Sequence, residues 1–68
     1  MEVDRQLLFA ARRLITGANV HRLNTLIFQY RMAVKISNEH KTSGLESQAK
    51  EYERQLRALV AKERMGRL

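Results

Sequence analysis

The sequence predicts an all-α protein in which a short amino-terminal helix precedes an antiparallel helical hairpin, forming a small three-helix bundle. The chain contains no Pro and only three Gly residues, at positions 17, 44 and 66, so little interrupts a helix. Apolar residues recur at three- and four-residue steps in the segments on both sides of the polar stretch EHKTS, residues 39–43. These observations predict helices over about 2–15, 19–38 and 44–65, within a single domain, 1–68.

The first helix is predicted from its apolar spacing and from the order of its charges. Glu2 and Asp4 fall in the first turn, and Arg12 and Arg13 fall in the last, as the helix dipole favours. Gly17 follows, as expected for a glycine cap. The apolar positions that recur at helical spacing are Val3, Leu7, Ala10, Ala11 and Leu14.

The central segment can be interpreted in two ways. In LIFQYRMAVKIS, residues 26–37, apolar side chains alternate as they do in a half-buried strand. The alternative fold is therefore α-β-α, with a central strand paired between two chains. Within one chain, however, residues 18–25 do not alternate and lack the Gly of a tight hairpin. We therefore favour a helix over about 19–38 with Asn19 as its cap.

A central helix would have two apolar stripes. One stripe is expected to pack on the third helix, and it comprises Leu23, Leu26, Ile27, Tyr30 and Val34. The other comprises Phe28, Met32 and Ile36 and needs a second cover. Either the first helix supplies that cover, or another chain does.

The third helix is predicted from a start signal and a long apolar seam. Ser43 is followed three residues later by Glu46, which is the spacing of a capping box, and Gly66 lies beyond the seam. The seam steps by four and three residues through Leu45, Ala49, Tyr52, Leu56, Leu59 and Glu63.

Size and composition limit the class of protein. A chain of 68 residues buries only a modest core, so a partner subunit or docking protein is expected. There is no Cys for disulfides or thiolate chemistry. Arg12 and Arg13 interrupt the apolar core that a signal peptide would need, and no charge-free run approaches a membrane span. We expect a cytoplasmic protein without membrane association.

Positive charge is concentrated in the first half of the chain. Lys and Arg number 13 and Asp and Glu number 7, which gives a formal net charge of +6. Such a field attracts polyanions and acidic protein surfaces. Residues 5–38 contain no acidic side chain, although they carry Arg5, Arg12, Arg13, Arg22, Arg31 and Lys35.

Few residues suggest chemistry. The only histidines, His21 and His40, have no second metal-type ligand at the helical spacing, and His40 is expected in a loop beside Glu39. No Gly-rich phosphate loop occurs. Paired carboxylates, such as Glu51 and Glu53, are two residues apart and diverge on a helix. We expect no metal, no cofactor, no small-molecule substrate and no enzymatic activity.

These features predict a small protein-interaction module of adaptor, assembly-factor or chaperone-like type. It would lay an apolar helix face against a protein partner or a second copy. Phe28, Met32 and Ile36 would be buried, and Arg31 and Lys35 would favour acidic surfaces. Phe9 lies among arginines on the first helix and is a further candidate contact.

The alternative is a protein that binds DNA or RNA through its basic first half. A helix, the link TGAN and a second helix opening NVHRLNT resemble a helix-turn-helix layout. The third helix has a basic stripe of Lys50, Arg54, Arg57 and Arg64, which would either follow phosphates or be a solvated face of alternating charges. The candidate nucleic-acid contacts are Arg12, Arg13, His21, Arg22, Asn24, Lys50, Arg54 and Arg57.

Overall fold

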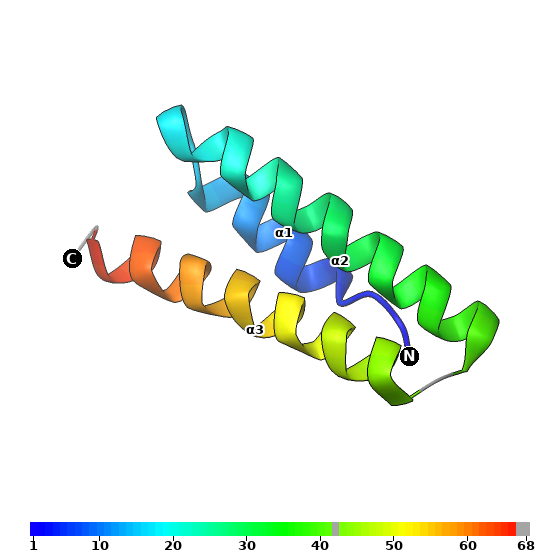
Figure 1. Cartoon of the computed structure of the whole chain (residues 1–68). Coiled ribbons are helices and arrows are strands. Elements are labelled where there is room, and N and C mark those ends of the chain that lie inside the picture. Colours follow the sequence, from blue (N-terminus) through cyan, green and yellow to red (C-terminus); the bar gives the residue numbers. More distant parts are fainter. Residues whose placement is uncertain (42, 67–68) are drawn as a thin grey trace.

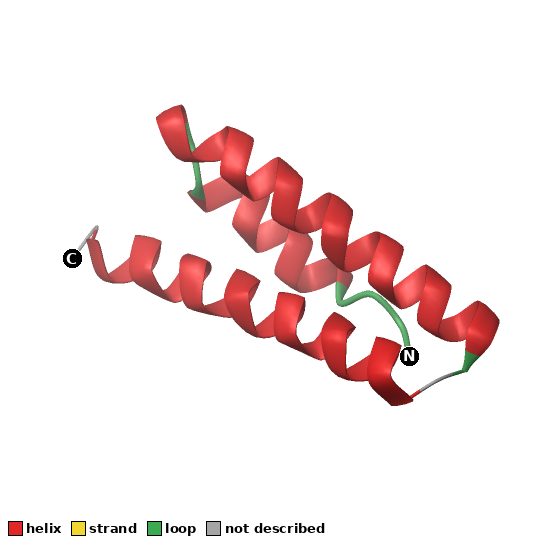
Figure 2. Cartoon of the chain, viewed as in Figure 1, coloured by secondary structure: helices red, strands yellow, loops and turns green. Residues whose placement is uncertain are grey.

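Three helices form an elongated bundle in the computed structural model, which describes residues 1–41 and 43–66 (Figures 1 and 2). They are α1 (Arg5–Leu14), α2 (Val20–His40) and α3 (Ser43–Gly66), with a short 3-10 turn η1 (Gly17–Asn19) between the first two. The described part contains no strand and measures 41 × 18 × 16 Å. The all-α prediction is confirmed. The cross-chain strand is wrong, because α2 continues through all of residues 26–37.

Helix α1 begins at Arg5 because Asp4 is its N-cap. Asp4 has extended backbone geometry, and its Oδ1 accepts a 3.1 Å hydrogen bond from the Leu7 amide. Glu2 and Asp4 were predicted inside the first helical turn, and that prediction is wrong. Residues 1–4 instead form a non-helical segment held along α2, where Asn38 Nδ2 donates a 2.7 Å bond to the Met1 carbonyl.

The connection from α1 to α2 differs from the predicted glycine cap. Ile15 ends α1 in an extended conformation, and its amide donates to the Ala11 carbonyl at 2.9 Å. The Ile15 side chain is buried, so core packing turns the chain out of the helix before Gly17 is reached. Gly17 adopts φ +72° and begins η1. Asn19 lies in that turn and makes no side-chain capping hydrogen bond.

Helix α2 extends past its predicted end, so Glu39 and His40 lie in its last turn rather than in a loop. Lys41 stops the helix with a left-handed φ of 52°, and its amide donates to the Ser37 carbonyl at 2.6 Å. Helix α3 then begins at Ser43. The predicted capping box depends on the Ser43 side chain, which lies outside the described part of the chain.

The core lies between the antiparallel helices α2 and α3, and α1 packs against both, chiefly against α3 (Figure 1). Every residue of the first predicted stripe of α2 is buried. Further buried side chains come from positions that the predicted stripes left out, among them Leu8, Ile15 and Val60. Because α1 is short and packs mainly on α3, part of α2 is left without a covering helix.

Candidate functional site: a basic groove beside helix α2

Helix α2 keeps large apolar side chains in solvent on its outer face. Phe28 is 65% exposed and Met32 is 38% exposed, whereas Tyr30 between them is fully buried. A single exposed Phe is common on protein surfaces. Two large apolar residues one turn apart on the same face instead make a patch that a partner can cover. Helix α1 therefore leaves the second apolar stripe of α2 partly uncovered, most of all at Phe28.

A groove of about 730 Å³ follows this face of α2. The wall on α2 extends from Asn24 to Asn38, and the opposite side is formed by the amino-terminal segment and α1. Its apolar surface includes Phe28, Met32 and Val3, and its basic residues are Arg12, Arg31 and Lys35.

A second hollow of about 390 Å³ adjoins the first, because Val3, Arg12 and Arg31 line both. Phe9, which is 64% exposed, lies on its α1 side together with Arg5. The structure thus brings the two exposed phenylalanines of α1 and α2 to one continuous surface. We call the two hollows together the α1–α2 groove.

The α1–α2 groove contains most of the residues predicted to bind a partner, but not all of them. Ile36 is half-buried and does not line either hollow. Each four-residue step along a helix rotates a side chain by about 40°, so two steps from Phe28 turn Ile36 away from the groove. The predicted residues that do line the groove are Phe9, Phe28, Arg31, Met32 and Lys35.

The groove cations have no acidic partner within the described part of the chain. Arg5, Arg12, Arg31 and Lys35 form no ion pair there, and no Asp or Glu lines either hollow. The groove therefore presents positive charge that the bundle itself does not neutralise.

The basic stripe of α3 is different, because three of its four predicted cations each have a nearby carboxylate. Lys50 lies 3.4 Å from Glu46, and Arg54 Nη1 lies 2.9 Å from Glu51. Arg57 pairs with Glu53 on its own helix at 2.8 Å. These contacts match a solvated face of alternating charges.

Arg13 does not line the groove but lies against Phe9, which does. Its guanidinium carbon lies 5.6 Å from the centre of the Phe9 ring, within the range of a cation–π interaction. Both side chains are exposed, so the interaction contributes little to stability. Its effect is to place another positive charge beside Phe9.

The remaining candidates for nucleic-acid contact divide between two places. Asn24 lines the groove together with Arg12, whereas His21 and Arg22 are exposed in the first turn of α2 and line neither hollow. Helices α1 and α2 run alongside each other in opposite directions (Figure 1). The helices of a helix-turn-helix motif instead cross at a steep angle.

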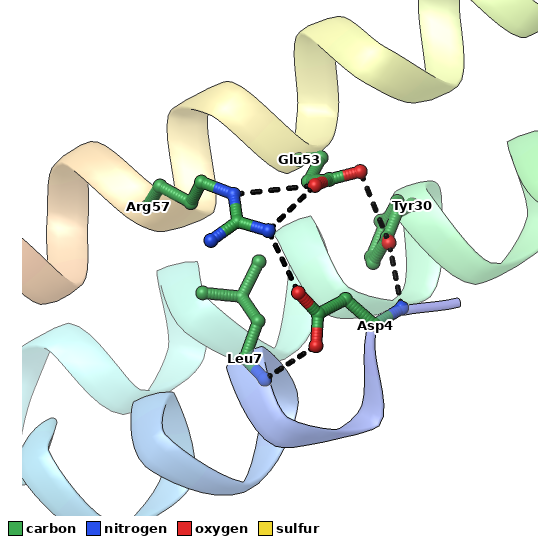
Figure 3. Close-up of polar contacts among 5 residues, drawn as sticks. All are labelled: Asp4, Leu7, Tyr30, Glu53 and Arg57. Atoms are coloured by element: carbon green, nitrogen blue, oxygen red, sulfur yellow. Dashed lines mark hydrogen bonds and ion pairs between the residues drawn. The ribbon is translucent and has the colours of Figure 1, made fainter. Parts of the chain in front are cut away.

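A polar cluster holds Asp4, the residue after Val3, against α2 and α3 (Figure 3). The Tyr30 hydroxyl accepts a 2.9 Å hydrogen bond from the Asp4 amide and donates a longer one, 3.5 Å, to Glu53. Arg57 donates to Asp4 Oδ2 at 2.7 Å and to Glu53 Oε1 at 2.8 Å. The cluster therefore joins α2, α3 and the start of α1.

The pKa values of two side chains in this cluster, Tyr30 and Arg57, are raised. Burial raises the pKa of Tyr30 above its ordinary value, and the Glu53 and Asp4 carboxylates raise it further, while the bond from the Asp4 amide opposes them. The hydrogen bond to Glu53 raises the pKa of Arg57. The sequence patterns did not single out this cluster. The available signal was Tyr30 itself, since a buried Tyr in an apolar stripe needs a hydrogen-bond partner.

Two other kinds of site are absent from residues 1–41 and 43–66. No three His, Asp or Glu side chains lie together in a way that could hold a metal ion. None of the helices there has the length and hydropathy needed to cross a bilayer.

Comparison of the chain with protein-family models, with curated proteins and with solved structures finds no match. Inferences about function therefore depend on the geometry and charge of the α1–α2 groove.

Proposed function

We propose that this chain is a small protein-interaction module of adaptor, assembly-factor or chaperone-like type, and that it binds a protein partner through the α1–α2 groove. The supporting observation is the exposure of Phe28 and Met32, one turn apart on α2, at a groove that α1 does not fill. Full burial of one such side chain contributes about 1.5–3 kcal/mol. This mode of action needs no catalytic group and no cofactor.

Site-directed photo-crosslinking in the cells that make the protein tests this proposal. A benzophenone amino acid replaces Phe28 in one variant and Gln29 in a matched control, because Gln29 is exposed on the same helix but does not line the groove. We expect a defined protein adduct, identified by mass spectrometry, from position 28 only. A second substitution, Met32→Asp, should reduce that adduct while circular dichroism shows unchanged helicity.

The same experiment separates protein binding from nucleic-acid binding. Nucleic-acid binding, the alternative function, has support from Arg12 and Asn24, which line the groove together with Arg31 and Lys35. Adducts with DNA or RNA at position 28, or equal protein adducts at positions 28 and 29, would contradict the proposed function.

A further inference from the structure

We infer that the α1–α2 groove binds an amphipathic helix of another protein, and that this helix carries Asp or Glu beside its apolar stripe. The inference rests on the proposed function and deepens it by naming the class of partner. Its evidence is the secondary structure of the groove walls, the position of the apolar side chains and the absence of carboxylates in the lining.

The walls of the groove favour a helix over an extended peptide. They are made by α1, α2 and residues 1–4, and the part of the chain that the structure describes offers no strand edge. An extended peptide lying there would bury amide and carbonyl groups without partners, whereas a helix satisfies its own. The α2 wall between Asn24 and Asn38 is about 21 Å long, which matches about four turns of a partner helix.

The apolar side chains are arranged as a helical partner requires. Phe28 and Met32 form an i, i+4 ridge on α2, and ridges of this kind pack into the grooves of a second helix. Phe9 lies across the surface on α1. A helix placed between them would complete a four-helix bundle, which covers α2 on both of its apolar faces.

The positive charge of the groove predicts which side chains flank the apolar stripe of the partner helix. Arg12 and Arg31 line both hollows and so lie in the middle of the surface, with Arg5 and Lys35 on either side of them. A docked helix would remove part of their hydration, which is unfavourable unless carboxylates replace the water. An acidic flank on the partner also speeds association and excludes basic partners. Arginine adds selectivity because its guanidinium can hold a carboxylate with two hydrogen bonds.

A second copy of this chain fits the groove poorly. Pairing through a two-fold axis places the same surface on both sides of the contact, so Arg12 and Arg31 would face like charges. A nucleic acid would satisfy these cations, yet its phosphate backbone offers no apolar surface to bury Met32 and Val3. An acidic amphipathic helix would pair with these cations and would also cover the apolar side chains.

Selection from a library of helical peptides tests the inference. The library randomises the exposed face of a stable helical scaffold, and the full chain serves as bait. Peptides are retained when they bind the wild type and Gln29→Asp but not Phe28→Asp, which restricts them to the groove. We expect these peptides to be enriched in Asp and Glu beside an apolar stripe. Their affinity should fall at least tenfold for Arg31→Glu, and selection on Arg12→Glu/Arg31→Glu should enrich basic peptides.

Other outcomes distinguish this inference from the proposed function. Phe28-dependent peptides that lack an acidic bias, or that bind Arg31→Glu unchanged, would overturn the acidic partner and leave the protein-interaction function intact. A selection that yields no Phe28-dependent peptide would contradict both. Circular dichroism and thermal melting of every variant establish that each bait is folded.

Two further measurements cover the competing occupants. Sedimentation of the wild type, Phe28→Asp and Gln29→Asp reports self-association, and a dimer broken only by Phe28→Asp would assign the groove to a second copy. Titration with duplex DNA and single-stranded RNA at several salt concentrations reports nucleic-acid binding. Tight, salt-sensitive binding that is lost in Arg12→Glu/Arg31→Glu and kept in Phe28→Ala would replace the acidic helix with a nucleic acid. We expect a monomer and no such binding.

Discussion

Arg57 Nη2 lies 2.7 Å from Asp4 Oδ2, which joins α3 to the residue that begins α1 (Figure 3). The other carboxylate oxygen of Asp4 caps α1 by accepting from the Leu7 amide. The Asp4 side chain therefore sets the first residue of α1 and also attaches that end of α1 to α3. Because Asp4 is held there, Val3 lines the groove instead of continuing a helix.

The cap is expected to contribute more to stability than the ion pair. Asp4→Ala removes both and should lower the free energy of unfolding by about 1 kcal/mol, the usual cost of a lost N-cap. Asp4→Asn retains a capping oxygen and removes only the charge, and partly exposed ion pairs contribute little. Urea unfolding should therefore place Asp4→Asn closer to the wild type than to Asp4→Ala. Equal losses in the two variants would contradict this order.

Stability should decline at high pH because of Tyr30. Its pKa is raised in the folded chain, so the folded state holds the phenol proton more tightly than the unfolded state, whose value is near 10.0. The resulting contribution is fully present below pH about 10 and is lost as the pH rises through the folded pKa. Tyr30→Phe lacks this dependence, so the stability gap between wild type and variant should narrow above pH about 10.

Phenolate absorbance provides a direct check of the raised Tyr30 pKa. In a Tyr52→Phe background Tyr30 is the only phenol in the chain. The midpoint of its absorbance titration should shift downward when urea unfolds the chain. A midpoint that is the same in the folded and unfolded chain would refute the prediction.

We expect no room for a larger side chain at Ala49, on the contact surface of α3. Ala49 is fully buried, whereas Ala58 is exposed on the same helix. Ala49→Leu should overpack the interface and cost about 1–3 kcal/mol. Ala58→Leu serves as the matched control and should change stability little, because Leu and Ala have similar helix propensities. Thermal melts that lower both midpoints equally would argue against close packing at Ala49.

Two left-handed residues should respond in opposite directions. Lys41 stops α2 at φ 52°, a conformation that is strained for a side chain with a Cβ, so Lys41→Gly should raise stability by about 1 kcal/mol. Gly17 has φ +72°, and Gly17→Ala should lower stability by about 1 kcal/mol. Gly44→Ala is the control. Gly44 lies in helix α3 and nothing lies within 4 Å of an added Cβ, so this variant should not lower stability. If urea midpoints moved Lys41→Gly and Gly17→Ala in the same direction, the strain argument would be wrong.

Local patterns determined the secondary structure of this protein. Periodicity placed all three helices and separated the buried stripe of α2 from the one that carries Phe28 and Met32, because both features depend on residues a few positions apart. It also placed Phe9 among arginines on the first helix. Ile36 belongs to the predicted set but does not line the groove, since helical rotation over two further turns decides which stripe residues share a groove.

Only the tertiary structure decided what surrounds these helices. The ion pair between Asp4 and Arg57, the extended Ile15 and the hydrogen bond between Asn38 and Met1 set the path of α1, and each depends on residues distant in sequence or on core packing. That path leaves α2 partly uncovered and brings Arg12 beside Arg31, while the carboxylates of α3 pair with cations of α3. Helical periodicity comes from short-range backbone geometry, whereas a groove and its net charge arise when separate segments pack together.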